Sequence, residues 1–496
     1  MVGRARALGV LTGASIPAGL YLLYVFHYSV NVPFTDDWSI VSLSASALRG
    51  QLTLSDLWTP YGKSGTRLFV PKLLFVTFTY VDHLNIKFIL FFSAVLLVVS
   101  YVLLLSLVRS YLAKGLSSLL AFSIGVVWFS LADEQNALWG FQLAWYLATF
   151  FFVVMVWCLL TTHRHRTIFF ALGIVAAIAG SYSIIQGFAL WPVGLICLLW
   201  TSPWGRRTYF EAAAWVSAAI LTAGIYLPGY SPGTGVVCLP HVPSCGLLSN
   251  LLHPVQLLQY LVSLLANVIP PTAQSQLHLS QIAYDVLGSV LFVAALFVVV
   301  QSVRKRIFGE SPLPLLLIMF GVLFDVMIAL GRLGRGPGDA LNQDRYTMPN
   351  LIVLVGIVLY SFSHLQALRE VHGPRDLRAK LRVVGFVLVG GFLLIQCGLT
   401  TDSGIRIGRI THQTREFDAR IVVNLDRIPV AVRGCDLSVA VWPPFSPNVL
   451  EYFAGPLRGE AARYELSVFQ PSSKRHYRSE GPPTLAQCVV KRPTTS

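Results

Sequence analysis

Two adjacent carboxylates follow the first apolar stretch of the chain, in the sequence Asn31-Val-Pro-Phe-Thr-Asp-Asp-Trp38. One member of such a pair can accept a proton from an attacking hydroxyl, and two close acids raise each other's pKa. Asp36 and Asp37 are therefore candidate general bases. The structural alternative is that one of them only caps a helix over residues 38–48.

A second segment combines closely spaced glycines with arginines. It reads Gly331-Arg-Leu-Gly-Arg-Gly-Pro-Gly338, followed by Asp344-Arg345-Tyr346. Glycines let backbone amides turn toward an anion. The guanidinium groups of Arg332, Arg335 and Arg345 can each form two hydrogen bonds to the oxygens of one phosphate. The pattern indicates a phosphate or pyrophosphate site at a membrane surface. The structural alternative is a turn whose basic residues contact lipid headgroups.

Three further acids lie at or inside apolar stretches. Asp133 and Glu134 end one stretch, just before Trp139-Gly-Phe-Gln142, and could hold a metal or an acceptor. A polar hairpin tip with interfacial aromatic residues is the structural alternative. Asp325 lies within another stretch, where an acid is costly and therefore suggests function. Its expected partner is Arg332 or Arg335, and a purely structural ion pair is equally consistent with the sequence.

The composition sets the environment of these residues. Of 496 residues, 55% are hydrophobic and only 12% are charged, and the mean hydropathy is +0.65. Soluble domains have about 25% charged residues, so a cytosolic enzyme is excluded. At about 20 residues per span, the chain can hold on the order of ten membrane helices and a soluble part. The fold class predicted is an α-helical polytopic membrane protein.

Apolar periodicity predicts about eleven transmembrane helices. They cover residues 8–30, 87–108, 115–131, 138–160, 167–185, 187–200, 210–228, 282–303, 312–331, 347–364 and 383–400. The sixth is short and indicates a tight hairpin or a broken helix. The first is interpreted as an uncleaved anchor, because it lacks a clean cleavage site.

The distribution of basic residues predicts the orientation. With the N-terminus in the cytoplasm, the inner segments hold sixteen Lys and Arg residues and the outer loops of the membrane part hold eight. This asymmetry follows the positive-inside rule. The net charge of +14 therefore comes mostly from basic residues in the cytoplasmic loops, which set the orientation of the protein in the membrane. No nucleic-acid partner is expected.

The predicted membrane domain covers residues 1–400, with long outer loops at 31–86, 229–281 and 332–346. Residues 68–81 and 251–270 are expected to form helices along the outer interface. Short alternating runs at 420–425, 437–442 and 464–469 lie between Pro and Gly clusters. They predict a small β-rich extracytoplasmic domain over residues 401–496.

The seven cysteines divide by location. Three lie inside predicted spans and are interpreted as core residues: Cys158, Cys197 and Cys397. The other four fall on the predicted outer side, where disulfides persist, as the candidate pairs Cys238 with Cys245 and Cys435 with Cys488. A cysteine metal site is disfavoured, because the chain has no CxxC motif and no histidine pair near these cysteines.

In their order along the chain, these motifs resemble the GT-C superfamily of membrane glycosyltransferases, and more closely a bacterial branch of it. The resemblance spans most of the first 350 residues. It is carried by Asp36-Asp37-Trp38, residues 58–74, Trp139-Gly-Phe-Gln142 and residues 331–346. It implies a lipid-linked sugar donor, usually a polyprenyl phosphate, and transfer on the periplasmic or external face.

The resemblance also implies roles for single residues. Asp36 or Asp37 would be the general base on the acceptor hydroxyl, and four arginines would steady the phosphate leaving group: Arg67, Arg332, Arg335 and Arg345. Acceptor or metal contacts would come from Trp38, Asp133, Glu134, Asp325 and Tyr346. Relatives often carry a His-Asn-Glu-His-Arg-like run where this chain has Tyr61-Gly-Lys-Ser-Gly-Thr-Arg67. Only Arg67 carries over; the acid and the histidines are absent, which argues against a metal or second-acid role at this run. A divalent cation is the one cofactor left open.

The function expected is a glycosyltransferase of the bacterial inner membrane. It would move a sugar from a polyprenyl-phosphate-linked donor to a cell-envelope glycan, lipid or protein acceptor. A lipid-linked glycan flippase is the first alternative, but a transporter should show internal repeats and charges along its spans, and the acids here cluster at outer helix ends. A non-catalytic envelope scaffold is the second, and it would tolerate the joint loss of Asp36 and Asp37.

Overall fold

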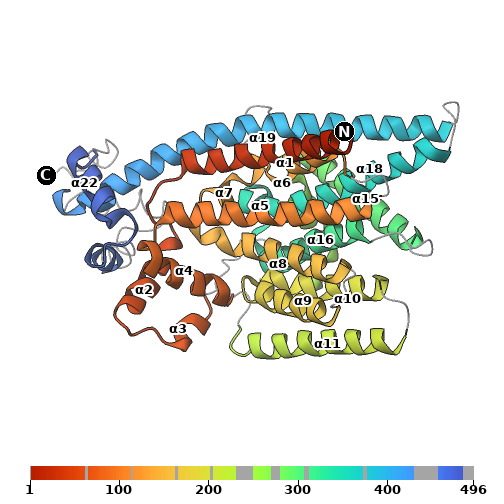
Figure 1. Cartoon of the computed structure of the whole chain (residues 1–496). Coiled ribbons are helices and arrows are strands. Elements are labelled where there is room, and N and C mark those ends of the chain that lie inside the picture. Colours follow the sequence, from red (N-terminus) through yellow and green to blue (C-terminus); the bar gives the residue numbers. More distant parts are fainter. Residues whose placement is uncertain are drawn as a thin grey trace.

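The structure, a computed structural model, describes residues 2–61, 65–112, 116–161, 166–201, 205–230, 250–269, 280–305, 312–371, 377–428 and 456–483. It is an elongated bundle of helices (Figure 1). Within the described ranges, the β pairing is limited to an isolated bridge between Tyr61 and Thr66.

The helices of the first half follow one another with short connections. They are α1 (Val2–Tyr28), α2 (Asp37–Leu48), α3 (Leu54–Trp58), α4 (Phe69–Asp82), α5 (Ile86–Tyr111), α6 (Ser118–Trp128), η2 (Leu131–Asp133), α7 (Glu134–Ala137), η3 (Gly140–Gln142), α8 (Leu143–Leu160), α9 (Arg166–Ser181), η4 (Ile185–Ala189), α10 (Leu190–Thr201) and α11 (Arg206–Tyr226).

The second half continues with α13 (Pro254–Ala266), α15 (Gln281–Lys305), α16 (Leu313–Arg332), η6 (Leu333–Arg335), α17 (Pro337–Leu341), η7 (Asp344–Tyr346), α18 (Thr347–Val371), α19 (Leu377–Asn424), η8 (Leu425–Arg427), η9 (Ser467–Phe469) and α22 (Pro471–Glu480). Residues 456–463 are also helical.

Eight helices of the described part are long and apolar enough to cross a membrane. They overlap the predicted spans at 8–30, 87–108, 138–160, 210–228, 282–303, 312–331, 347–364 and 383–400. Large apolar side chains remain exposed along several of them, including Leu20, Phe26, Ile220 and Val293. A lipid environment accounts for this exposure, and the protein is membrane-embedded.

The other three predicted spans are the shorter helices α6, α9 and α10, so the total of eleven spans stays a prediction. The expected tight hairpin at the sixth span is present. The chain turns between α9 and η4, where Gly187 packs directly against the carbonyl of Gly180. A side chain at position 187 would not fit this contact.

The C-terminal part differs most from the prediction. α19 is one helix of 48 residues, which at 1.5 Å per residue is about 72 Å long, against a hydrocarbon core of about 30 Å. Figure 1 shows α19 extending past the ends of its neighbours toward α22. The predicted domain boundary at residue 400 therefore falls inside a continuous helix.

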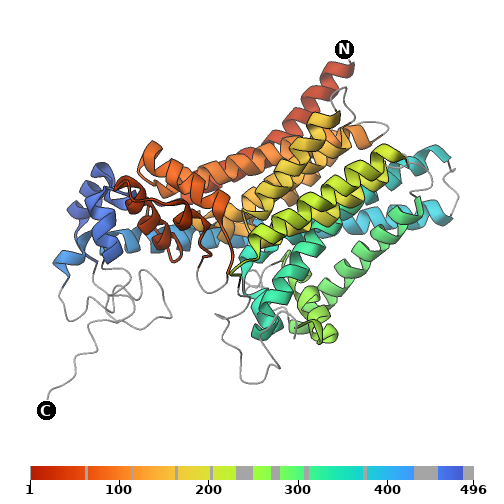
Figure 2. The ribbon, with the colours of Figure 1, turned by 90° about the horizontal axis from the view of Figure 1, so that it is seen from below.

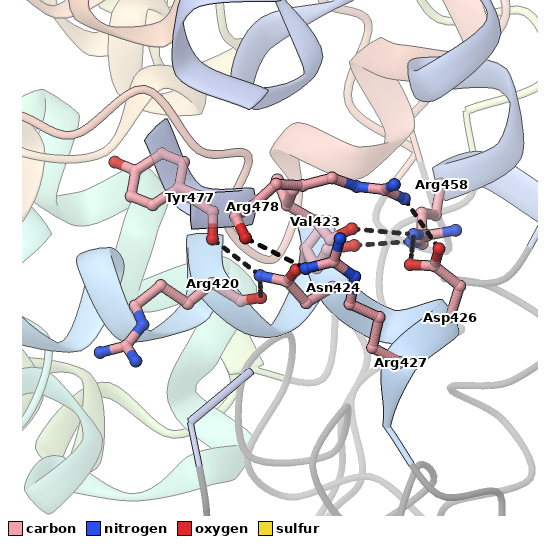
Figure 3. Close-up of polar contacts among 9 residues, drawn as sticks. Arg420, Val423, Asn424, Asp426, Arg427, Arg458, Tyr477 and Arg478 are labelled. Atoms are coloured by element: carbon pink, nitrogen blue, oxygen red, sulfur yellow. Dashed lines mark hydrogen bonds and ion pairs between the residues drawn. The ribbon is translucent and has the colours of Figure 1, made fainter. Parts of the chain in front are cut away.

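The predicted β-rich domain is wrong for the residues that the structure describes. Residues 420–425 belong to α19 and η8, and residues 464–469 form a turn followed by η9; the run at 437–442 lies outside the described residues. Figure 3 shows the hydrogen bonds and ion pairs that join the end of α19 to the C-terminal helices. Arg458 donates to the carbonyls of Val422 and Val423, and Asn424 donates to the carbonyl of Tyr477.

The C-terminal helices dock onto the segment between α1 and α5. The amide of Asn31 donates to the Ser467 carbonyl at 3.0 Å, and its oxygen accepts from the Ile86 amide at 2.9 Å. Arg49 forms an ion pair with Glu460 at 2.6 Å. In both views α2, α4 and α22 lie together at one end of the bundle, and the N-terminus lies toward the other end (Figures 1 and 2). This grouping places the candidate acids at the α22 end.

Candidate functional site

The acid pair lies on a tight turn between α1 and α2. The Asp37 amide donates to the Phe34 carbonyl, and the Trp38 amide donates to the Thr35 carbonyl. Thr35 has a φ of 44°, a left-handed conformation that is unusual for a β-branched residue. Such strain costs on the order of 1–3 kcal/mol and often occurs at functional sites.

Asp36 directly precedes α2 and bonds to Tyr61. Its side chain makes no capping hydrogen bond to α2; instead, Oδ1 accepts from the Tyr61 hydroxyl at 2.7 Å. The capping alternative is therefore wrong for Asp36. Burial raises the pKa of Asp36, while the Tyr61 hydrogen bond and the charges of Arg345 and Arg332 lower it in part.

Asp37 has a different environment, because it is only 1% exposed. Its Oδ2 accepts from the Phe34 amide at 3.1 Å, and a Cβ on Gly140 would lie 3.2 Å from Oδ1. Burial raises the pKa of Asp37 to about 7, against the lowering effects of the Phe34 amide and the Arg415 charge. Asp37 thus stabilises its own turn and is closed to a large substrate.

The arginines of the Gly331–Tyr346 segment approach Asp36 from the other half of the chain. Arg332 and Arg345 are half-buried, and both charges act on the Asp36 carboxylate. The Arg345 guanidinium lies 5.7 Å from the centre of the Trp139 ring. Within the described part of the chain neither arginine forms an ion pair with a carboxylate, so both can receive an anionic ligand.

Arg335 is more constrained than these two arginines. Its guanidinium lies 3.7 Å from Asp339, whose second oxygen accepts from Tyr260 at 3.0 Å. Gly336 has a φ of 79°, which lets the chain turn between η6 and α17 at a position that favours glycine. The turn explains why a glycine is needed beside the arginines.

Aromatic rings in contact with one another connect the acid turn with Arg345. Phe34 contacts Trp139 edge-to-face at 5.6 Å, and the ring of Tyr61 lies 4.6 Å from that of Phe141. Trp139 and Phe141 are themselves 6.4 Å apart. A polar carboxylate, two arginine cations and a set of aromatic faces can together bind a phosphate next to a sugar.

Asp133 and Glu134 form a buried support beneath Arg345 rather than an exposed hairpin tip. Both are less than 10% exposed. Asn136 donates to Asp133 at 2.6 Å and to the Arg345 carbonyl at 2.9 Å. Burial raises the pKa of both acids well above the usual range. Across the described residues, no group of three or more His, Cys, Asp or Glu side chains could hold a metal ion.

Three other residues that were predicted to contact the substrate are buried in the structure and contact other parts of the protein. The Arg67 guanidinium donates to the carbonyls of Trp58, Tyr226 and Pro228, which fixes the loop; its expected phosphate role stays a prediction. Trp38 is fully buried, and its expected contact with an acceptor stays a prediction. Tyr346 is 3% exposed and lies beneath Arg345, 5.3 Å from its guanidinium.

Asp325 is buried within α16 at 1% exposure. The expected ion pair with Arg332 or Arg335 is not formed, and within the described residues neither carboxylate oxygen has a hydrogen-bond partner. The four candidate disulfide cysteines, Cys238, Cys245, Cys435 and Cys488, lie outside the described residues.

Two residues at the site were missed by the sequence prediction. Tyr61 stands at the start of the run that departs from the family pattern, so position was the only available signal. Arg415 comes from α19 and places its guanidinium 3.0 Å from the centre of the Phe34 ring. Nothing in the sequence pointed to it, because the tail was predicted to fold separately.

No protein-family model, curated protein or solved structure matches this chain.

Proposed function

We propose that the protein is a membrane glycosyltransferase of the GT-C type, which moves a sugar from a polyprenyl-phosphate donor to a cell-envelope acceptor. One observation carries the proposal: Asp36 lies within electrostatic reach of Arg332 and Arg345, about 300 residues away in sequence. Such a site offers a base for an acceptor hydroxyl and cations for a phosphate leaving group.

In this mechanism Asp36 accepts the proton of the acceptor hydroxyl as that oxygen attacks the anomeric carbon. The bond from this carbon to the phosphate oxygen breaks, and Arg345 and Arg332 stabilise the negative charge that remains on the lipid phosphate. Asp36 is favoured over Asp37 because it is the less buried of the two and because the charges of Arg332 and Arg345 act on its carboxylate. Asp37 holds the turn.

The location at the membrane suits a lipid-linked donor. The arginines lie at the end of α16 and in the turn before α18, two helices long enough to cross the bilayer. A polyprenyl chain could remain in the hydrocarbon while its phosphate reaches these side chains. We place this site on the outer face of a bacterial inner membrane, on the strength of the distribution of basic residues.

The test is sugar transfer by purified protein in lipid nanodiscs, supplied with a panel of short-chain polyprenyl-phosphate monosaccharides and envelope acceptors. Asp36→Asn should lower kcat by about 10²-fold or more, whereas Asp37→Asn should retain measurable turnover. Asp402→Asn is the matched control, because Asp402 is exposed on α19. Wild-type turnover by Asp36→Asn would exclude Asp36 as the base. If the protein were a non-catalytic envelope scaffold, its binding to envelope components would be unchanged after the loss of both Asp36 and Asp37.

A further inference from the structure

The middle of α19 packs closely against the C-terminal end of α1, next to the turn that carries the acid pair. The Tyr24 hydroxyl donates to the Gly404 carbonyl at 3.0 Å. A Cβ on Gly408 would lie 2.7 Å from the same hydroxyl and 2.9 Å from the Tyr28 ring. His412 Nδ1 lies 3.3 Å from the Tyr28 carbonyl. These contacts fix the rotation of α19 about its axis.

This orientation of α19 places Arg415 against the turn of residues 34–37, which carries the acid pair. The Arg415 side chain is 12% exposed, and its guanidinium lies 3.3 Å from the Asp418 carboxylate, which is 3% exposed. The guanidinium carbon is 3.0 Å from the centre of the Phe34 ring, while the Phe34 amide donates to Asp37. A buried cation is costly unless carboxylates compensate for it, and Asp418 and Asp37 provide two.

We propose that Arg415 is a positioning residue of the transferase site, which holds the Phe34–Asp37 turn in the conformation that presents Asp36. This inference rests on the proposed function and adds a contribution of the C-terminal segment to the site. Arg415 acts through Phe34 and Asp37 and does not touch the substrate. The groups that face Asp37 are Arg415 from α19, Asp36 in the same turn, and the backbone amides of Phe34 and Phe141.

The test compares Arg415→Gln and Arg415→Lys with Arg409→Gln, a control at an exposed position of the same helix. Arg415→Gln should lower kcat by about tenfold and leave the KM for the lipid donor within about twofold, as expected for a group that is remote from the donor. Arg415→Lys should recover part of kcat, because it retains the charge but not the planar group over Phe34. Arg409→Gln should match the wild type.

A double-mutant cycle with Asp37→Asn separates positioning from general stability. In the Asp37→Asn background, Arg415→Gln should cause less than about a twofold further loss of kcat. Equal losses in both backgrounds, or wild-type kcat in Arg415→Gln, would overturn the proposal. If Arg415→Gln does not fold, the cycle is run with Arg415→Lys.

The same cycle can also be measured by thermal unfolding, which does not require enzymatic activity. If the wild type transfers no sugar from any donor, the proposed function fails, and thermal unfolding of the four proteins then decides the placement of Arg415. Non-additive changes in Tm would support its coupling to Asp37. Additive changes would contradict it.

Discussion

The adjacent residues Asp36 and Asp37 have different surroundings, which favour different roles in the proposed function. Asp36 is half-buried, bonded to Tyr61 and faced by two arginines, whereas Asp37 is enclosed and bonded to the main chain of its own turn. Neighbouring carboxyls with different environments commonly divide catalytic and structural tasks. The sequence predicted that the pair was important, but it could not separate the two, since the difference arises from Tyr61, Gly140 and Arg415.

Tyr61→Phe should shift the acidic limb of the transfer rate to higher pH. The Tyr61 hydroxyl donates to the Asp36 carboxylate and so lowers the pKa of Asp36; without it, a larger fraction is protonated at a given pH. A lost bond of about 1.4 kcal/mol corresponds to about one pH unit. The measurement is kcat/KM from about pH 5 to 9, with Tyr80→Phe, an exposed tyrosine of α4, as the control. An unchanged limb would show that Asp36 is not the titrating base.

The stability of Asp37→Asn relative to the wild type should rise as the pH increases from about 4 to 7. Burial raises the pKa of Asp37 to about 7, above its value of about 3.9 in an unfolded chain. The neutral carboxyl therefore favours the folded state at low pH, and this contribution is lost as the pH rises through about 7. Thermal unfolding in detergent at several pH values between about 5 and 8 measures the effect. A Tm difference between variant and wild type that stays constant with pH would contradict it.

At the scale of elements, the membrane helices were predictable and the helical tail was not. Long apolar runs indicated the spans, because a helix satisfies its backbone hydrogen bonds in lipid without neighbours. In the tail, Ile421, Val422 and Val423 favour a strand by their β-branched side chains, yet they lie in α19. All three are buried against the C-terminal helices, and this tertiary packing overrides the local preference.

Gly408→Ala should weaken the contact between α1 and α19. A Cβ at this position would meet the Tyr24 hydroxyl at 2.7 Å and the Tyr28 ring at 2.9 Å, so one helix must move. The expected cost is about 1–3 kcal/mol in unfolding free energy. Gly398→Ala is the matched control in the same helix, because nothing lies within 4 Å of its Cβ; it should be neutral or stabilising by up to about 1 kcal/mol. Equal Tm values for the two variants would argue against close packing at Gly408.

At the scale of the whole molecule, the residues of the proposed site gather at one end of the bundle. The C-terminal helices contact the segment between α1 and α5 there, and the charges of Arg332 and Arg345 act on Asp36 from hundreds of residues away in sequence. The sequence could assign the first two to the same side through alternation of the spans. It could not show that Asn31 bonds to Ser467 or that Arg415 reaches Phe34, because such contacts depend on the length and direction of α19.

The orientation of this end can be tested by cysteine labelling. Asn342 is exposed, in the segment between Arg335 and Arg345, whereas Arg207, whose side chain is 60% exposed, lies in the first turn of α11. The distribution of basic residues predicts Asn342 outside and Arg207 in the cytoplasm. A membrane-impermeant maleimide should therefore label Asn342→Cys in intact spheroplasts and label Arg207→Cys only after the membrane is disrupted, with the wild-type cysteines as the baseline. The opposite pattern would place Asp36 and the arginines on the cytoplasmic face, where transfer from an outward-facing polyprenyl phosphate could not occur.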